Sequence, residues 1–279
     1  MMNNAPEVEK IDCPLCGGTH FSAWGRKDGL DIVKCVACHL IFVNPRPTPT
    51  ALERYYSINY FQGGNYEEDE QRIAQYKFEM NLLLPIIGTR GRFLDVGCAM
   101  GRFLHTLPES FEKHGIEFSK DAAEFGRKRF GLNIRHGQIS KLDVQKEFFD
   151  VAQMRGVVEH LQHPVDDMIA VNRALKPGGW YILSQTPNIG SWSGKIYRAR
   201  HNQVFPNEHL TYFTPKTVEK MLNKAGFEVV HRFYPYLGTP YENWPKDLVN
   251  FALNYISGKD SPPFWGNMMV LVSRKTKSL

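Results

Sequence analysis

The spacing of hydrophobic and polar positions along the chain changes near residue 90. From there on, short apolar runs alternate with longer segments whose apolar residues recur at helical spacing. This alternation is typical of an open, mostly parallel α/β sheet. We therefore predict strands over 92–96, 115–118, 133–136, 149–154 and 179–185, with helices over 121–130 and 165–175 between them.

The C-terminal region departs from this alternation. A helix is expected over 217–225, where Gly226 ends it, and a strand over 227–233. A long irregular stretch then leads to a last strand over 267–274. This region is expected to complete the sheet.

The N-terminal third contains a proline-rich stretch that separates two segments. Pro45, Pro47 and Pro49 exclude a helix there and predict an extended linker. Helices are expected after it, over 50–56 and 67–84. The chain thus divides into an N-terminal segment (1–47), a helical linker or cap (48–88) and an α/β domain (89–279).

Four of the five cysteines lie within the first 38 residues. They form two pairs, Cys13-x-x-Cys16 and Cys35-x-x-Cys38, separated by eighteen residues, which is the spacing of a zinc ribbon. Four thiolates complete the tetrahedral shell that Zn²⁺ prefers and leave no position for a catalytic water. The sequence therefore predicts a structural zinc ion that stabilises the fold of a segment too short to build a core of its own.

Other uses of this cysteine segment stay open. The ribbon could be a docking surface for substrate, a partner protein or RNA, the cysteines could form disulfides, and His20 or His39 could replace a thiolate. Gly17 and Gly18 follow the first pair, where a tight turn would direct backbone amides at the sulfurs.

Composition and charge narrow the class of protein. With 42% hydrophobic and 13% aromatic residues, the 279-residue chain can bury a large core, which excludes a disordered or collagen-like protein. Its apolar runs are too short to span a membrane and its first residues lack a secretory signal, so we expect a cytoplasmic location. The net charge of +5 permits an anionic partner. Nucleic acid is disfavoured, because the three cations inside the cysteine segment are offset by two acidic residues.

A glycine-rich turn follows the first predicted strand of the α/β domain. Gly97 and Gly101 allow the backbone to turn sharply and approach a ligand, and the helix after them offers free amides. Glu117 follows Gly97 by twenty residues at the end of the next strand, where a carboxylate can bind both ribose hydroxyls. Ala99 and Arg102 occupy the second and third places of the dinucleotide fingerprint, so a mononucleoside ligand fits better.

The stretch from Leu94 to Gly101 resembles motif I of the class I S-adenosylmethionine-dependent methyltransferases. Further matching segments follow in the family's order at 115–119, 149–151, 159–161, 175–179, 209–214 and 225–229. The resemblance implies a Rossmann-like, seven-stranded methyltransferase sheet behind the zinc ribbon, and a small-molecule methyl acceptor. The Cys-Pro-x-Cys-Gly ribbon with its Asn-Pro-Arg-Pro segment is similar to methyltransferases of sugar and secondary metabolism.

The same resemblance assigns roles around the cofactor. Gly97 and Gly101 would border the methionine and ribose parts of S-adenosylmethionine. Asp95 would help to hold the amino group of the cofactor, and Glu117 would clamp the ribose. Cys98 would line the turn between them, as a small buried residue.

Two further residues are expected at the adenine. By the resemblance, Phe118 would lie against the ring. Gln138 stands where the family often has an acidic residue that reads the adenine amino group, and its amide oxygen could accept the same hydrogen bond. Ala99 replaces the middle glycine of the commonest motif I. The extra methyl group is small enough to be compatible with cofactor binding.

Two histidines are candidates for the chemistry. Methyl transfer from a sulfonium is an in-line displacement, which needs a positioned nucleophile and, for a hydroxyl, a base. His160 follows the fourth strand, at the edge where ligands bind open sheets, and His209 ends a segment after the fifth strand. Capping and packing by Glu159 and His160 is the alternative. Ubiquinone-type O-methyltransferases resemble this stretch but carry a glutamate where Gly156 stands.

The segment 188–209 is rich in aromatic and cationic residues and takes the place of the family's substrate lid. This content suits an anionic, ring-bearing acceptor. We therefore expect an S-adenosylmethionine-dependent methyltransferase that acts on a hydroxyl of a sugar, nucleotide sugar or related metabolite. An RNA methyltransferase whose ribbon binds nucleic acid and a non-catalytic regulator that binds the cofactor stay open as alternatives, and the oligomeric state is left undefined.

Overall fold

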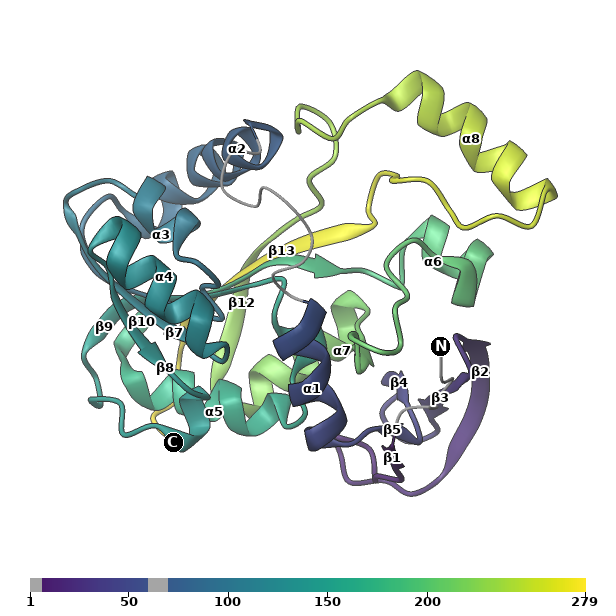
Figure 1. The fold of residues 1–279 in the computed structure, drawn as a ribbon, viewed down its shortest axis with the longest axis horizontal. Helices are drawn as coiled ribbons and strands as arrows, with labels where there is room; N and C mark the ends of the chain where they lie inside the picture. The colour runs from purple at the N-terminus through teal and green to yellow at the C-terminus, as the bar shows by residue number, and fades with distance from the viewer. Residues whose placement is uncertain (1–6, 60–69) are drawn as a thin grey trace.

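The computed structural model describes residues 7–59 and 70–279. Its centre is a seven-stranded sheet with the strand order β12-β13-β10-β9-β6-β7-β8 (Figure 1). The strands from β10 to β8 are mutually parallel, and β13 runs antiparallel to both of its neighbours. The strands are β6 (Gly91–Val96), β7 (Phe111–Glu117), β8 (Asn133–His136), β9 (Phe149–Arg155), β10 (Leu175–Pro187), β12 (Phe227–Phe233) and β13 (Met268–Lys275). This confirms the predicted α/β fold with a seven-stranded sheet.

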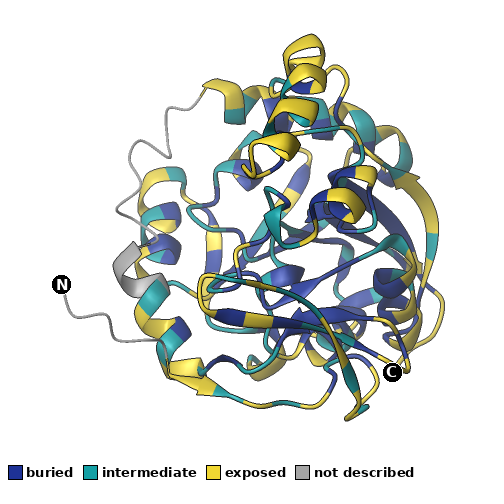
Figure 2. Ribbon diagram, turned by 90° about the vertical axis from the view of Figure 1, so that its right-hand side faces the viewer, coloured by how far each residue is buried: buried dark blue, intermediate teal, exposed yellow. Residues whose placement is uncertain are grey.

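Helices cover both faces of this sheet. One hydrophobic cluster includes Tyr76, Phe103 and Ala123 and fills the face under α2, α3 and α4. A second cluster, with Met168 and Met221, fills the face under α5 and α7. Figure 2 shows buried residues along the central strands and exposed residues on the outer helices. The helices are α2 (Glu70–Ile87), α3 (Arg102–Thr106), α4 (Lys120–Phe130), α5 (Pro164–Ala174) and α7 (Pro215–Lys224).

Local sequence signals explain where these helices begin and end. The Ser119 side chain accepts the Ala122 N–H at the start of α4, and Gly131 ends that helix in the left-handed conformation. Thr214 and Thr217 form a reciprocal capping box at the start of α7. The helix expected over 67–84 begins outside the described residues, and its remainder is part of α2.

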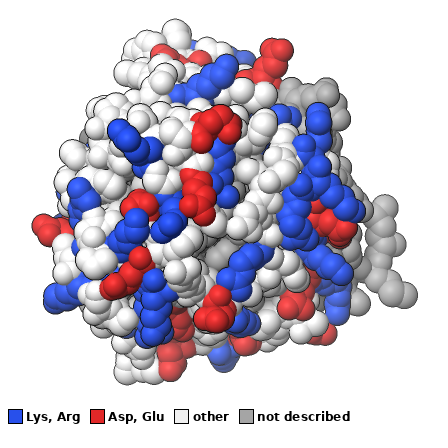
Figure 3. All heavy atoms as spheres, turned by 90° about the vertical axis from the view of Figure 1, so that its left-hand side faces the viewer, with Lys and Arg blue, Asp and Glu red and all other residues white. Residues whose placement is uncertain are grey.

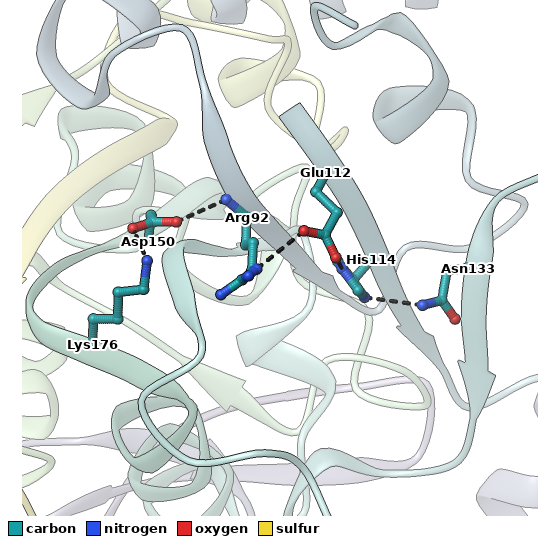
Figure 4. A network of polar contacts seen from close by, with 6 residues as sticks. All are labelled: Arg92, Glu112, His114, Asn133, Asp150 and Lys176. Carbon is teal, nitrogen blue, oxygen red and sulfur yellow. Dashed lines mark hydrogen bonds and ion pairs between the residues drawn. The ribbon is translucent and has the colours of Figure 1, made fainter. Parts of the chain in front are cut away.

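A polar network ties together the amino-terminal ends of five neighbouring strands (Figure 4). The Asp150 carboxylate accepts the Arg92 backbone N–H (2.8 Å) and pairs with the Lys176 ammonium. The Arg92 guanidinium pairs with Glu112 (3.0 Å), and Glu112 contacts the ring of His114 (2.8 Å). Ion pairs thus line this end of the sheet, and the cavity described below lies at the opposite, carboxyl-terminal end.

The N-terminal segment forms a small antiparallel sheet with the order β11-β4-β3-β2. Three of its strands come from the cysteine segment, whereas β11 comes from residues beyond the fifth strand of the large sheet, where Thr211 pairs with Phe42. The short strands β1 (Val8–Glu9) and β5 (Arg46–Pro47) pair beside it. The strands of the small sheet are β2 (Phe21–Lys27), β3 (Leu30–Cys35), β4 (Ile41–Val43) and β11 (Thr211–Tyr212).

The region between β12 and β13 differs from the prediction. The stretch expected to be irregular holds α8 (Trp244–Ile256), a helix of 13 residues, so that prediction was wrong. Its apolar residues do not face the core, and a search for a core-facing stripe therefore misses it. Two further helices, α1 (Pro49–Asn59) and α6 (Trp192–Tyr197), complete the described part. Within residues 7–59 and 70–279, the structure contains no helix with the length and apolar character of a membrane span.

Candidate active site

A cavity of about 320 Å³ opens at the carboxyl-terminal ends of β6, β7 and β9. Six of the seven residues predicted at the cofactor line it, and they come from three separate stretches of the chain. Gly101, the seventh, lies at the start of α3, next to the lining residues Met100 and Arg102. The six lining residues are Asp95, Gly97, Cys98, Glu117, Phe118 and Gln138.

The turn after β6 depends on two glycines. Gly97 and Gly101 have φ values of 78° and 77°, a conformation that residues with a Cβ rarely adopt. A Cβ at Gly97 would lie 2.5 Å from a methyl group of Val157, and one at Gly101 would lie 2.5 Å from a methyl group of Leu132. Ala99 also has a positive φ of 50°. The turn therefore brings the backbone close to the cavity and tolerates only small residues at positions 97, 99 and 101.

Glu117 organises this turn from the end of β7. One of its carboxylate oxygens accepts the Ala99 N–H (2.8 Å) and the other accepts the Ser119 N–H (2.7 Å). Burial raises the pKa of Glu117, and these amide donors oppose the shift. Each oxygen retains a second lone pair, so the carboxylate can also accept hydrogen bonds from a diol. This geometry fits the predicted clamp on a ribose.

Asp95 is buried in the wall of the cavity, and its Oδ1 atom has no hydrogen-bond partner among the described residues. Burial raises its pKa to about 7, an effect that Arg155 opposes and that Glu117 and Glu79 reinforce. An orphaned buried carboxylate oxygen is costly unless a donor from a ligand satisfies it. The site therefore fits a ligand with a cationic amino group, such as that of S-adenosylmethionine.

The end of the cavity where adenine is predicted contains a residue that the sequence reasoning missed. The Gln138 amide nitrogen donates to both carboxylate oxygens of Asp167 (2.9 and 3.2 Å). Asp167 comes from α5 and also accepts a hydrogen bond from the Ser140 hydroxyl (2.6 Å). Since the amide nitrogen is held in this way, the orientation of the Gln138 amide oxygen is fixed. Phe118 lines the same end of the cavity and is 47% exposed.

The two candidate histidines lie side by side at the other end of the cavity. The ring centroids of His160 and His209 are 4.6 Å apart with the rings nearly perpendicular. His160 lines the cavity, whereas His209 is absent from its lining. The Nδ1 atom of His160 lies 3.1 Å from the Glu208 carbonyl oxygen, and that of His209 lies 2.8 Å from the Gln203 carbonyl oxygen. In a neutral ring that donates through Nδ1, the lone pair is on Nε2.

A buried carboxylate accompanies these rings. Burial lowers the pKa of both His160 and His209 and raises the pKa of Glu159 to about 8. One oxygen of Glu159 has no hydrogen-bond partner among the described residues. Ligand atoms of the three residues lie within 4.8 Å of one another, so this group could also hold a divalent cation.

Helix α2 contributes residues for which the sequence carried no motif. Glu79 is fully buried and makes two bonds of 2.9 Å to the guanidinium of Arg155, at the end of β9. The Arg155 guanidinium lies 4.7 Å from the ring centroid of Tyr76. Arg155 and Tyr76 line the cavity together with Arg72 of the same helix. An amphipathic helix carries no signal of which residue meets a site, so only the structure identifies them.

The four N-terminal cysteines converge as predicted, and none of them is in a disulfide. Their sulfur atoms lie within 4.8 Å of one another, with 3.4 Å between Cys13 and Cys38 and 3.6 Å between Cys16 and Cys35. A tetrahedral zinc ion with Zn–S bonds of about 2.3 Å separates its sulfurs by about 3.8 Å. The sulfur positions therefore fit a metal ion.

Backbone groups around the sulfurs also fit thiolate ligands. Burial opposes ionisation of Cys35, but the N–H groups of Cys38 and Ala37 donate to its sulfur and lower its pKa to about 7. A Cβ at Gly18 would lie 3.3 and 3.4 Å from two of the sulfurs, so this glycine leaves room for the cluster. His20 and His39 are not members of the group.

The cysteine segment is joined to the active site through backbone hydrogen bonds. The Val43 N–H of β4 donates to the Leu210 carbonyl (3.0 Å), and the Leu210 N–H donates to the Glu159 carbonyl (2.8 Å). Leu210 follows His209, and Glu159 precedes His160. Two contacts thus connect the ribbon to both candidate histidines.

Side chains reinforce this junction. Lys220 and Lys224 of α7 donate to the carbonyls of Cys38 (3.4 Å) and Leu15 (2.8 Å). The buried cysteines belong to the same hydrophobic cluster as Met221 and the central strands. The ribbon and the large domain therefore share one core.

Comparisons with known proteins identify the family of this chain. A family model described as a methyltransferase domain matches residues 68–232. The ubiquinone biosynthesis O-methyltransferase of Roseobacter denitrificans is 28% identical over 201 residues, which cover 67% of this chain and 79% of that protein. The enzyme of the same name from Ruegeria pomeroyi is 29% identical over 207 residues, which cover 69% and 81%.

Solved structures share the fold. The 1,6-didemethyltoxoflavin-N1-methyltransferase of Burkholderia thailandensis, with bound S-adenosylhomocysteine, is 17% identical, covers 92% of this chain and 100% of its own, and has a TM-score of 0.57. An S-adenosylmethionine-dependent methyltransferase of Thermotoga maritima is 22% identical, covers 81% and 96%, and has a TM-score of 0.54. Since the family model spans more than half of the chain, including the strands that carry the cavity, this protein belongs to the methyltransferase domain family and is an S-adenosylmethionine-dependent methyltransferase.

Proposed function

We propose that this enzyme methylates a hydroxyl group of a small molecule, such as a sugar, a nucleotide sugar or a related metabolite, with His160 as the general base. The observation that carries the proposal is that His160 lines the same cavity as Asp95 and Glu117. Its Nδ1 atom faces the Glu208 carbonyl, and the lone pair of the neutral ring is therefore on Nε2. The names of the similar ubiquinone enzymes describe transfer to oxygen, which supports a hydroxyl acceptor.

The cofactor would be held by the residues at the ends of β6, β7 and β8. Bound S-adenosylmethionine supplies an electrophilic methyl group on a sulfonium. The orphaned oxygen of Asp95 would accept a hydrogen bond from the amino group, and the Glu117 carboxylate would accept hydrogen bonds from the ribose hydroxyls. The fixed amide oxygen of Gln138 accepts a hydrogen bond from the adenine amino group, and Phe118 covers the ring.

At the acceptor end, His160 would take the proton of the acceptor hydroxyl, and the oxygen would receive the methyl group that S-adenosylmethionine supplies when bound, with S-adenosylhomocysteine as the leaving group. The proton moves to Nε2, while Nδ1–H keeps its bond to the Glu208 carbonyl. His209 supports the ring of His160 from outside the cavity. The wall formed by Leu52, Arg72 and Tyr76 suits a ring-bearing, anionic acceptor.

The cysteine cluster would hold one structural zinc ion. Its four sulfurs close the coordination shell, which leaves no open position for chemistry. The contacts of Lys220, Lys224 and β11 with the ribbon favour a role inside the fold over a free docking surface. On the face shown in Figure 3, Lys and Arg side chains are interspersed with Asp and Glu, which also disfavours a nucleic-acid surface there.

The test is methyl transfer from labelled S-adenosylmethionine to fractionated small-molecule and RNA pools, with binding of S-adenosylhomocysteine measured in parallel by calorimetry. Label in a small-molecule fraction that resists mild base, as a methyl ether does and a methyl ester does not, supports the proposal. Label in RNA supports the alternative nucleic-acid function, and tight cofactor binding with no labelled pool supports a regulator. The same assay with and without EDTA and with added Mg²⁺ decides whether Glu159, His160 and His209 act on the acceptor through a metal ion.

A further inference from the structure

Arg155 and Glu79 form an ion pair in the wall of the cavity that the proposed mechanism does not use. Glu79 of α2 is fully buried, and its two carboxylate oxygens accept hydrogen bonds from Nε and Nη2 of Arg155, each at 2.9 Å. The side-chain amides of Gln75 (2.9 Å) and Gln185 (2.7 Å) also donate to Glu79 Oε1. A carboxylate with four donors is held in one orientation, and it fixes the guanidinium that it binds.

The guanidinium retains donors after this pairing. An arginine carries five N–H groups, and Glu79 takes one on Nε and one on Nη2 of Arg155. The two N–H groups of Nη1 and the second N–H of Nη2 form another edge of the guanidinium, and no described residue accepts a hydrogen bond from them. Arg155 lines the cavity, and 18% of its side chain is exposed. This edge can therefore bind a carboxylate of a ligand through two parallel hydrogen bonds.

Arg155 lies beside Asp95, the residue proposed to hold the amino group of the cofactor. Asp95 of β6 is the register partner of Gln153 of β9, and Arg155 follows Gln153 by two residues on the same face of the sheet. Burial raises the pKa of Asp95, and the charge of Arg155 opposes that rise, as expected for two neighbouring groups. The wall of the cavity thus presents an anionic and a cationic group side by side.

This pair of charges matches the two charges of an amino acid, whose ammonium and carboxylate are attached to one carbon atom. Asp95 offers an orphaned oxygen to an ammonium, but alone it would repel the carboxylate next to it. We propose that Arg155 binds the methionine carboxylate of S-adenosylmethionine, and that Glu79 is the positioning residue that orients its guanidinium. This inference rests on the proposed role of Asp95 at the amino group.

The first test compares two ligands that differ only in the carboxylate. They are S-adenosylhomocysteine and its decarboxylated analogue, S-adenosylthiopropylamine, each titrated by calorimetry into the full-length protein. The wild type should bind S-adenosylhomocysteine about 10- to 100-fold more tightly, which is the usual size of a contact between charged groups. In Arg155→Met this preference should disappear, because only S-adenosylhomocysteine loses affinity. A wild-type protein without the preference, or an Arg155→Met variant that retains it, overturns the proposal.

The second test guards against misfolding, because Arg155→Met alone leaves the buried Glu79 without its partner. The double variant Arg155→Met, Glu79→Gln should lose the same preference, since an amide oxygen at position 79 still accepts from Gln75 and Gln185. Glu79→Gln alone should reduce the preference about 3- to 10-fold and leave the affinity for the analogue unchanged. Equal weakening of both ligands would overturn the positioning role. Arg102→Gln, which changes an arginine that lines the cavity from α3, is the matched control and should keep the preference. Circular dichroism confirms that each variant is folded.

The third test separates the sources of a carboxylate. If Arg155→Met keeps the preference and raises only the KM of the methyl acceptor, Arg155 binds the acceptor and the proposal is overturned. A preference that disappears in Arg72→Gln instead assigns the cofactor carboxylate to the arginine of α2 and also overturns it.

Asp95→Asn distinguishes a failure of this inference from a failure of the proposed function. Both ligands carry the amino group, so this variant should weaken both of them alike. If it does so while Arg155→Met keeps the preference, the inference fails alone. If neither substitution alters either affinity, the proposed cofactor site fails with it.

Discussion

The two ends of the cavity are assembled in different ways. The end proposed to bind the cofactor is made by the ends of neighbouring strands and the turns directly after them, so that Asp95, Gly97 and Glu117 meet wherever those strands pair. The end proposed to bind the acceptor combines Tyr76 of α2, His160 after β9 and the Glu208 carbonyl beside the ribbon. The difference teaches that local sequence can specify most of a ligand site when the sheet itself brings the residues together.

The substitution His160→Gln is the strongest test of whether the two ends of the cavity act independently. The variant should lose about 10²- to 10⁴-fold in kcat, because a general base is removed, while the affinity for S-adenosylhomocysteine stays unchanged. Steady-state kinetics measures kcat, which reports on the acceptor end, and calorimetry measures the affinity for S-adenosylhomocysteine, which reports on the cofactor end. His163→Gln, the same change at an exposed neighbour, is the matched control. Equal losses of cofactor affinity and turnover would show that the ends are not independent.

Asp95→Asn probes the opposite end. Replacing the carboxylate weakens a charge-assisted hydrogen bond to the cofactor amino group, so the dissociation constant of S-adenosylmethionine should rise about 10- to 100-fold. Calorimetric titration measures this change. Cofactor affinity within about twofold of the wild type would remove Asp95 from the cofactor site.

The same variant has a predictable pH dependence. The pKa of Asp95 is about 7 in the folded protein and about 3.9 in an unfolded chain. Because the folded-state pKa is raised, the stability contributed by the neutral acid is complete below about pH 4 and is lost as the pH rises through 7. Cofactor-free Asp95→Asn should therefore be more stable than the wild type at pH 8, by about 2 kcal/mol in urea unfolding, and the difference should shrink at pH 5. A constant difference across this range would contradict the assignment.

Replacing one of the four cysteines should change turnover at the acceptor end and leave cofactor binding unchanged. We expect Cys35→Ser to lower the zinc content measured by native mass spectrometry and to reduce kcat about 10-fold, since the Val43 to Leu210 to Glu159 contacts position the histidines. Cofactor affinity should change less than about twofold. Val36→Ala, an exposed change in the same turn, serves as the control. Full metal occupancy in Cys35→Ser would argue against four thiolate ligands.

The smallest expected effect concerns Ala99. This residue adopts a positive φ of 50°, which costs an alanine about 1 kcal/mol or more. Ala99→Gly should therefore raise the free energy of unfolding by about 0.5–1 kcal/mol after the greater flexibility of the unfolded glycine is taken into account. Urea unfolding measures it. A decrease in stability would mean that the Ala99 methyl group packs usefully in the turn.

The parts of the fold that could be predicted share one property: residues close together in the sequence determine their structure. The parallel strands, the glycine turn and the cysteine pairs each carry their signal within about ten residues. Helix α8 was missed because its apolar face points outward, and Asp167 was missed because α5 reaches the cavity from a distant position in the chain. The contact of His160 with His209 joins residues 49 positions apart, and no local pattern encodes it.

Strand β11 has a consequence for any attempt to shorten this enzyme. It is a two-residue piece of the large domain whose partner is β4 of the N-terminal segment. A chain that begins at residue 48 would leave β11 as an unpaired edge and would expose Phe213, which the ribbon's core residues now help to bury. Unpaired edges and bare aromatic surface promote aggregation. The linker at residues 44–49 is therefore a boundary in the sequence but not a place at which the folded protein can be divided.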